Sequence, residues 1–478
     1  MILARPGRAL VLALSLACRA AADEGAAPPT LMRDLAARGL HDPADEAWNA
    51  YAQATWISSW KPAFPARYTN LNGSINSLLP HAEYSFTGTA TLFLGVRLWS
   101  GGEAYFVPEV ISERPLSQLR GLGGAIQNFE LQKTGGVNPT LYRSRAYLRQ
   151  TFGLGGGTVE RESDQMQLGG RVDRRRIVVV LGNFSVLDFF DRNAFTSDPR
   201  QQFLSMQFMT HAAWDFAADA RGYSWGGVVE LYWDDWALRA SRVSPPIEPN
   251  QLPVDLRLDR HYGDSVELEH QHTLLGRAGA VRLLAFRNRE VMGRFDDAVA
   301  VWRADPSRNA AACTSFNYGS SNATAPDLCW VRRPNVKVGV GVSVDQYVTE
   351  SAGLFLRALW ADGQSEVDAY TSADRSVSLG ALARGAPWGR PLDLAGAAAG
   401  LEWISASHAE YLALGGIDAF IGDGALRRAQ EANVELFYSV NVLPALWVTA
   451  DWQHIWNPGF NADRGPVHVL GMRIHAQY

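Results

Sequence analysis

Arginine and glutamate side chains at every second position are the residues of this sequence best suited to bind a solute. Arg143, Arg145 and Arg149 follow one such row, and Glu267 with Glu269 begins another. Guanidinium groups and carboxylates on facing surfaces, with aromatic rings among them, suit a neutral solute that is rich in hydroxyl groups. Alternatively, the rows are structural ladders that brace a wide sheet. Further polar residues placed on strands in the same way are Glu230, Tyr232, Arg239, Arg287, Glu435, Asp451 and Arg473.

Such rows require extended strands, in which successive side chains point to opposite faces. Residues 336–345 show this most clearly, because five valines alternate with lysine, glycine, serine and aspartate. One face of such a strand meets an apolar environment and the other a polar one. Alternating segments of about ten residues recur along the chain, and we distinguish seventeen of them. The weaker segments are 48–60, 174–185, 205–216, 376–384 and 394–404.

The connections between these segments are of two kinds. Some are short, such as 101–102 and 234–235, whereas others are long and polar, such as 244–263 and 291–334. This combination is typical of a transmembrane β-barrel. We therefore predict an all-β fold, a transmembrane antiparallel β-barrel with short periplasmic turns and long extracellular loops. Bacterial barrels have even strand numbers, so we expect 16 strands, with 18 as the alternative, and suspect segment 164–172 as the source of the odd count.

The barrel assigns a direction to the charged rows. A charge on the lipid face at mid-bilayer depth costs roughly 2–4 kcal/mol. We therefore predict that the Arg, Glu, Asp and Tyr residues named above line the lumen. Tryptophans near strand ends, among them Trp99, Trp233 and Trp456, fit the aromatic girdles at the two membrane interfaces.

Composition excludes several other classes of protein. The chain has 478 residues, a net charge of −5 and 11% aromatic residues. Abundant aromatics argue against a disordered chain, and the absence of a basic excess argues against a nucleic-acid binder. We find no catalytic motif in its required context and no clustered metal ligands, so we predict no cofactor and no enzymatic activity. An outer-membrane barrel enzyme stays an alternative, because residues that meet only in space form no sequence motif.

The N-terminal region indicates export. Arg5 and Arg8 precede an apolar run, and small residues follow up to Ala22. We predict a signal peptide over residues 1–22, a leader over 23–47, and the barrel domain over 48–478. Leucine spacing in the leader indicates a short helix, which either rests in the periplasmic mouth or is mobile.

Two cysteines remain after removal of the signal. Cys313 and Cys329 both lie in a long polar stretch without histidine. In an exported protein, such a pair is expected to form one disulfide.

Two further segments carry information about assembly and the pore. The last segment, 466–478, alternates and ends on Tyr478, as is typical of the strand that the barrel-assembly machinery recognises. Asp188, Asp191 and Arg200 lie in a connection between strands. One interpretation is turn chemistry; another is that they pin a loop folded into the lumen, which forms a constriction.

Several motifs, taken together, resemble a known family. From about Trp48 to the C-terminus, the chain is similar to the carbohydrate-selective porins of Gram-negative outer membranes, the OprB-type family. The closing motif is the most specific, because it joins a loop and a final strand at fixed spacing. The matching stretches are 128–133 (NFELQK), 142–153 (YRSRAYLRQTFG), 182–193 (GNFSVLDFFDRN), 198–203 (DPRQQF), 213–225 (AWDFAADARGYSW), 421–424 (IGDG) and 457–475 (NPGFNADRGPVHVLGMRIH).

The resemblance implies a fold and a function. Members are barrels, often of sixteen strands, through which glucose and other small sugars diffuse past a constriction that bears arginine and glutamate. We expect an outer-membrane porin for passive, carbohydrate-selective diffusion, in contact with outer-membrane lipid and either monomeric or trimeric. The alternative within channels is a general or anion-leaning diffusion porin.

Overall fold

The computed structural model describes residues 28–132, 136–313 and 322–478. The predicted signal peptide, residues 1–22, lies outside these ranges.

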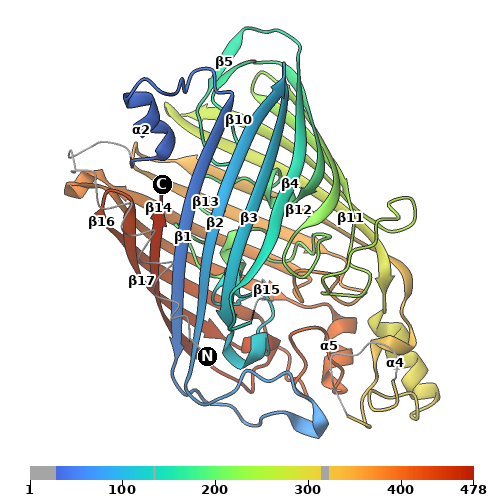
Figure 1. The fold of residues 1–478 in the computed structure, drawn as a ribbon. Coiled ribbons are helices and arrows are strands. Elements are labelled where there is room, and N and C mark those ends of the chain that lie inside the picture. The colour runs from blue at the N-terminus through green and yellow to red at the C-terminus, as the bar shows by residue number, and fades with distance from the viewer. Residues whose placement is uncertain (1–27, 133–135, 314–321) are drawn as a thin grey trace, which may run out of the picture.

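Sixteen strands form one closed antiparallel barrel (Figure 1). Strand β1 (Trp48–Lys61) closes the wall by pairing with β18 (Val467–Gln477), and the predicted sixteen-stranded barrel is confirmed. Strands β5 (Thr158–Arg161) and β6 (Gly170–Asp173) form a separate two-stranded sheet. The remaining strands are β2 (Glu83–Trp99), β3 (Gly102–Arg114), β4 (Thr140–Gly153), β7 (Arg176–Phe184), β8 (Ser224–Trp233), β9 (Trp236–Val243), β10 (Tyr262–Leu274), β11 (Arg277–Met292), β12 (Arg333–Tyr347), β13 (Ala352–Ala361), β14 (Arg375–Gly385), β15 (Arg390–Trp403), β16 (Glu431–Leu443) and β17 (Leu446–Trp456).

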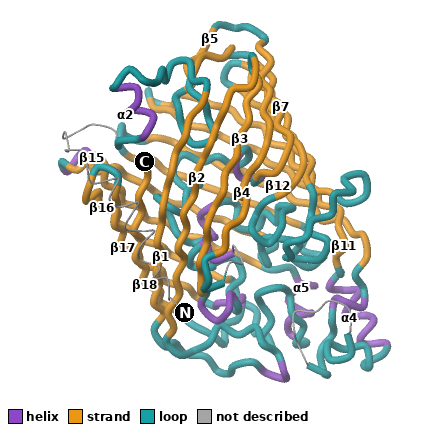
Figure 2. The backbone as a smooth tube through the Cα atoms, viewed as in Figure 1, coloured by secondary structure: helices purple, strands orange, loops and turns teal. Residues whose placement is uncertain are grey.

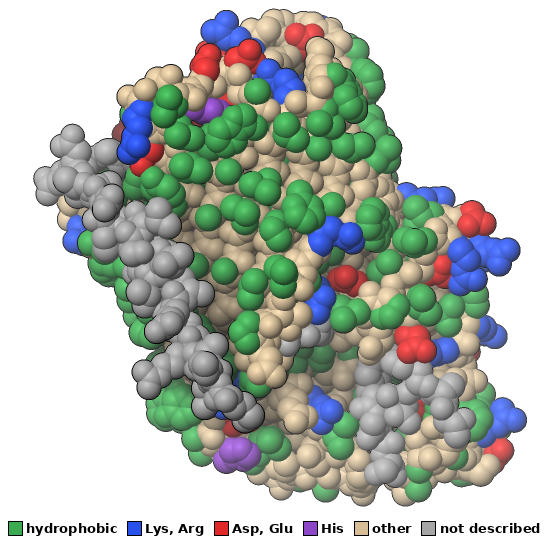
Figure 3. All heavy atoms as spheres, viewed as in Figure 1, with side chains coloured by type: hydrophobic (Ala, Val, Ile, Leu, Met, Phe, Trp, Pro, Cys, Tyr) green, Lys and Arg blue, Asp and Glu red, His purple; other side chains and the backbone are tan. Residues whose placement is uncertain are grey.

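The alternation of side chains sorts them between two environments. On β12, Val336, Val338 and Val340 are 41%, 37% and 55% exposed on the outside, whereas Lys337 and Ser343 are buried on the inside. Figure 3 shows hydrophobic side chains spread over the outer surface of the wall. The apolar face is therefore the outer, lipid-facing one.

The seventeenth predicted strand, 205–216, does not exist. This segment lies in the connection between β7 and β8 and contains a short helix, α3 (Met206–Met209). Its alternating large residues, such as Phe208, Trp214 and Phe216, are all buried. Segment 164–172 contributes no strand to the barrel either, so the odd count comes from 205–216 and the prediction that 164–172 causes it is wrong.

The two ends of the barrel differ. One end carries tight connections, such as the turn after β8, where Asp234 adopts a left-handed φ of 57°, a conformation that aspartate tolerates. Figure 2 shows that loops and helices gather at the other end, which is therefore extracellular. One periplasmic connection, 154–175, is long because it contains β5 and β6. The prediction of short periplasmic turns is wrong at this position.

The extracellular loops are ordered by local contacts. Helices α4 (Phe295–Ala304) and α5 (Ala406–Ala413) lie in two of them. The Ser405 hydroxyl caps α5 by accepting the backbone N–H of His408 at 3.0 Å. Cys313 and Cys329 form a disulfide in the loop between β11 and β12.

A short helix, α2 (Leu31–Ala37), lies at the periplasmic mouth. The Thr30 hydroxyl caps it by accepting the Arg33 backbone N–H at 3.2 Å. Met32 is buried against Tyr51 and Phe93, which project from the lumen face of β1 and β2. Among the described residues, no helix has the length and apolarity needed to cross a membrane.

Candidate functional site

Residues 185–223, which join β7 to β8, fold into the barrel; we call this segment the inward loop. It begins with a turn of 3-10 helix, Val186–Asp188, where Ser185 and Asp188 cap one another reciprocally. Nearly all side chains from 203 to 220 are buried. The lumen is therefore filled largely by the chain itself, and the remaining space is small.

A buried ion pair anchors the inward loop to β13. The Nε atom of Arg357 lies 2.8 Å from Oδ2 of Asp191, and both side chains are 1% exposed. Arg357 also donates hydrogen bonds to the carbonyls of Phe208 at 2.8 Å and Thr196 at 2.7 Å. Burial by itself raises the pKa of the Asp191 carboxyl, but Arg357 and other partners lower it below its ordinary value. Asp191 thus stays ionised and keeps the loop attached.

Three residues predicted to line the pore also hold this loop. Glu435 on β16 accepts two backbone N–H groups of the loop at 2.6 and 2.9 Å. Arg473 on β18 donates to three loop carbonyls at 2.7–2.9 Å, and Glu267 on β10 accepts the Asp191 N–H at 2.7 Å. Asp451 is buried beside them on the lumen face of β17. These side chains point inward as predicted, but they contact the loop instead of an open channel.

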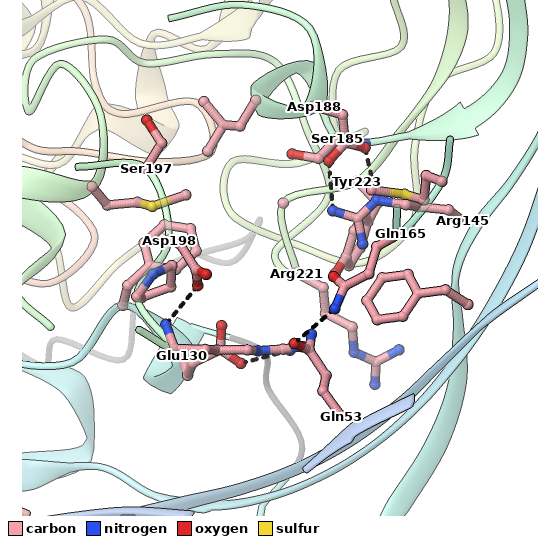
Figure 4. Close-up of a pocket in the computed structure, with 18 of the residues that line it drawn as sticks. Gln53, Glu130, Arg145, Gln165, Ser185, Asp188, Ser197, Asp198, Arg221 and Tyr223 are labelled. Carbon is pink, nitrogen blue, oxygen red and sulfur yellow. Dashed lines mark hydrogen bonds and ion pairs between the residues drawn. The ribbon is translucent and has the colours of Figure 1, made fainter. Parts of the chain in front are cut away.

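A cavity of about 210 Å³ remains between the inward loop and the wall (Figure 4). Arg145 and Asp188 face one another on one side of it, and Glu130 and Asp198 lie on the opposite side. Apolar and aromatic side chains complete the lining, namely Phe93, Phe129, Met166, Leu187, Met209, Phe216 and Tyr223. Charges and rings therefore surround one small space.

Arg145 is the predicted residue that reaches this cavity. Its Nε and Nη2 atoms donate to the two carboxylate oxygens of Asp188 at 2.7 and 2.6 Å. Its guanidinium lies 5.3 Å from the ring centre of Tyr223. The side chain keeps 16% of its surface exposed, so one edge of the pair stays available to a solute.

Arg200 forms a second charged group at the cavity. Its Nη2 lies 2.6 Å from Glu109 on β3 and 3.2 Å from Glu130, and its Nη1 donates to Thr91 at 2.9 Å. Arg200 belongs to the inward loop, whereas Glu109 belongs to the wall. The ion pair thus joins the loop to the wall and places a guanidinium at the cavity.

A ladder of alternating charges crosses the lumen face from β8 to β12. Arg239 contacts Glu230 at 3.1 Å, Glu267 at 2.9 Å and Glu269 at 3.1 Å. Arg282 continues the ladder, contacting Glu269 at 2.8 Å and pairing with Asp345 on β12. The register explains it, because Glu230, Arg239 and Glu267 are successive cross-strand partners. Tyr232 donates to Glu230 at 2.8 Å.

Arg149 lies nearer the periplasmic end of the lumen. Its guanidinium is 5.0 Å from the ring centre of Tyr105 and 5.8 Å from that of Tyr147. Its Nη1 donates to the carbonyl of Met166 at 3.0 Å, which links the wall to the periplasmic connection 154–175. Arg149 therefore braces this connection beside the cavity.

Arg143 and Arg287 are not in the lumen, and their predicted position is wrong. The β3–β4 register shifts at Ser144, so Arg143 pairs with Pro108 and lies on the outer face with its guanidinium over Trp225. A bulge reverses side-chain parity beyond it, which sequence alternation cannot show. Arg287 is cross-strand partner to Val338, whose side chain faces outward. Both arginines lie toward the extracellular strand ends, where an outward charge costs little.

Other charged side chains at the site were not among the residues predicted to line the pore. Glu109, Arg282 and Asp345 lie on lumen faces and could have been found from parity on β3, β11 and β12. Asp188 and Arg200 lie on the inward loop, which is not a strand, so side-chain alternation assigns them to no face. The sequence feature that indicates them is the dense pattern of Asp, Asn and Arg residues in that connection. The interpretation that this pattern pins a loop inside the lumen agrees with the structure.

Comparison with known proteins identifies the family. A family model described as the carbohydrate-selective porin, OprB family, matches residues 78–478. The chain belongs to this family. The porin is therefore an outer-membrane channel of the Gram-negative type, and the predicted family is confirmed. Comparison with curated proteins gives no match.

One solved porin structure shares the fold, and two others are more distantly similar. OprB of Pseudomonas putida, in its high-pH structure, superposes with a TM-score of 0.64 at 15% identity, covering 93% of this chain and 96% of that one. The low-pH structure of the same protein gives 0.47 at 12% identity, covering 96% and 100%. The outer-membrane channel DcaP of Acinetobacter baumannii gives 0.47 at 10% identity, covering 90% and 97%.

Proposed function

We propose that this porin lets small neutral sugars diffuse passively across the outer membrane, and that the cavity beside the inward loop selects them. The observation that carries the proposal is the cavity itself, where the Arg145–Asp188 pair and Arg200 surround a space lined with aromatic rings. Glucose-type monosaccharides and small oligosaccharides are the solutes that this chemistry suits best.

The proposed selectivity follows from how sugars bind. Each sugar hydroxyl is both donor and acceptor, so it can accept from a guanidinium N–H and donate to a carboxylate at the same time. The apolar face of a sugar ring can pass over an aromatic side chain such as Phe129 or Tyr223. Because Arg145 and Asp188 already hold one another in a fixed geometry, little order is lost when a sugar replaces the solvent at their edge.

The charge balance favours neutral solutes over anions. The charged residues that line the cavity are Arg145, Arg200, Arg221, Glu130, Asp188 and Asp198, three of each sign. An anion-selective pore requires an excess of cationic side chains. This balance supports the sugar porin over the anion-leaning alternative.

Planar-bilayer recording tests the proposal. The purified full-length porin is inserted into a bilayer, and glucose is titrated while single-channel current is recorded. We expect open channels whose current falls as glucose rises, with weak preference between potassium and chloride. Open channels that are unaffected by glucose, or a strong chloride preference, would contradict the proposal in favour of a general or anion-leaning porin.

A further inference from the structure

Arginines gather on the outer surface of the barrel near its extracellular end. The register places Arg242 of β9 and Arg287 of β11 on either side of Asp264 of β10. Arg289 lies two residues further along β11, toward the extracellular end. Arg375 begins β14 and is the cross-strand partner of the outward-facing Trp360. These side chains face the lipid, so the pore does not use them.

Positive charge exceeds negative charge along this edge. Asp264 is held by Arg242 through two bonds of 2.8 Å. The other nearby carboxylate, Asp362, accepts a hydrogen bond from the backbone N–H of Val338 at 3.3 Å. Within residues 28–132, 136–313 and 322–478, neither Arg287 nor Arg375 forms an ion pair. Two guanidinium groups therefore lack an anionic partner.

An apolar groove of about 840 Å³ runs along the outer face next to these two arginines. Arg375 forms part of its lining, and Arg287 lies two residues from Ala285, another lining residue, on the same face of β11. Small residues such as Ala285 and Ala358 lie between larger ones, which leaves the hollow. The other outward-facing lining residues are Val266, Leu268, Leu283, Val340, Val342, Trp360, Val377 and Trp403.

We propose that this groove is a binding site for an acylated, phosphorylated lipid of the outer leaflet. Acyl chains fill the groove, and phosphate groups accept hydrogen bonds from Arg287 and Arg375 at its extracellular edge. Arginine presents several donors in a planar fork that matches a phosphate. The two arginines are three strands apart and offset by two residues along the strands, so their Cα atoms are about 16 Å apart at the usual strand spacing and rise. Long side chains at this separation suit a headgroup with two phosphates.

Charge favours a lipid over a second copy of the chain as the occupant. In a two-fold contact the same patch meets itself, so Arg287 and Arg375 would face the like charges of the other copy. A phosphorylated headgroup instead supplies the missing anions at the depth where the arginines lie. The apolar floor beneath them lies at the depth of acyl chains.

The test measures lipid binding to the full-length porin in detergent micelles by native mass spectrometry. The probes are diphosphoryl lipid A and the same lipid with both phosphates removed. We expect the phosphorylated probe to bind roughly tenfold more tightly, since one charge-assisted hydrogen bond is worth about 1.5 kcal/mol or more. Equal binding of the two probes would overturn the proposal.

Two variants separate the parts of the site. The double variant Arg287→Gln/Arg375→Gln should abolish the preference for the phosphorylated probe. The variant Ala285→Trp should weaken the binding of both probes, because the tryptophan fills the groove. The matched control is Arg171→Gln/Arg277→Gln, which removes two exposed charges at the periplasmic end and should leave binding unchanged. These residues do not line the pore, so an unchanged single-channel conductance shows that each variant is folded.

The remaining outcomes are equally decisive. Excess inorganic phosphate should not displace the lipid, because the acyl chains contribute to binding; full displacement would indicate a free-anion site and overturn the lipid assignment. A change of oligomeric mass in the double variant, without any effect of the lipid phosphates, would show that the edge is an interface between copies.

Discussion

Arg357 and Asp191 form a buried ion pair that joins the barrel wall to the loop inside it, with Nε and Oδ2 2.8 Å apart. The pair joins residues 166 positions apart in the sequence. The pair is the contact that holds the inward loop to β13, while Glu435, Arg473 and Glu267 hold it to other strands.

Substituting Arg357→Gln should widen the channel. Losing one partner of a buried ion pair costs about 3–5 kcal/mol, so the inward loop should detach from β13. We expect a higher single-channel conductance and weaker glucose block in planar bilayers. Arg242→Gln is the matched control, because it breaks an ion pair on the outer face; equal conductance in Arg357→Gln and wild type would argue against the anchor.

Substituting Arg145→Ala should weaken glucose block about tenfold, the effect of losing one charge-assisted hydrogen bond to the sugar. Arg143→Ala is the control, since this residue lies two positions away on the same strand but on the outer face. Titration of glucose against channel current measures both. If glucose block of the channel current were weakened equally in both variants, the faces of β4 assigned to Arg143 and Arg145 would be wrong.

Substituting Glu269→Ala should destabilise the barrel. Glu269 contacts both Arg239 and Arg282 at about 3 Å, and its removal leaves two buried guanidinium groups short of a partner, a loss of about 3–5 kcal/mol. Thermal unfolding in detergent measures it. Glu350→Ala, which removes an exposed partner of Arg277, should have little effect, and an equal loss in both would count against the ladder.

Extracellular loop stability should fall as pH rises above neutrality. The buried His408 lies 3.2 Å from both Asp374 and Asp418. Burial lowers its pKa, but the two carboxylates outweigh this and raise the pKa to about 9. The pKa of His408 is higher in the folded protein than its value of 6.5 in the unfolded chain. The stabilisation by charged His408 is therefore complete below pH 6.5 and is lost as pH rises to about 9.

Unfolding temperatures between pH 6 and pH 10 measure this effect. The free energy of unfolding of the wild type should fall by up to about 3 kcal/mol over that range. The variant His408→Gln should lack this pH-dependent loss, because glutamine does not titrate. Parallel curves for the two proteins would show that His408 is not charged in the fold.

The wall of the barrel was predictable from the sequence, because each strand faces lipid on one side. The valines of β12 alternate for that reason, and the same logic placed Arg239, Glu269 and Arg473 inside. It failed at Arg143, where one extra residue at Ser144 reverses the parity. The alternation of residue types in the sequence does not reveal such a bulge.

The interior was less predictable, since the inward loop has no single outward face. Phe208, Trp214 and Phe216 alternate but are buried in the lumen on all sides, so they imitate a strand. The cavity combines Arg145 from β4 with Asp188 and Arg200 from the inward loop. Their proximity depends on tertiary contacts such as Arg357–Asp191, which no short sequence window contains.

The pairing of β1 with β18 has a consequence for how the protein is made. The seam joins Gln53 to Gln477, so the two edges that must meet come from opposite ends of the wall. No shorter stretch of the chain contains both edges, and an open sheet would expose unpaired backbone groups to lipid. Contacts this distant in sequence form slowly. Closure must therefore follow delivery of the final strand, and until then the nascent sheet needs another protein or surface to protect its edges.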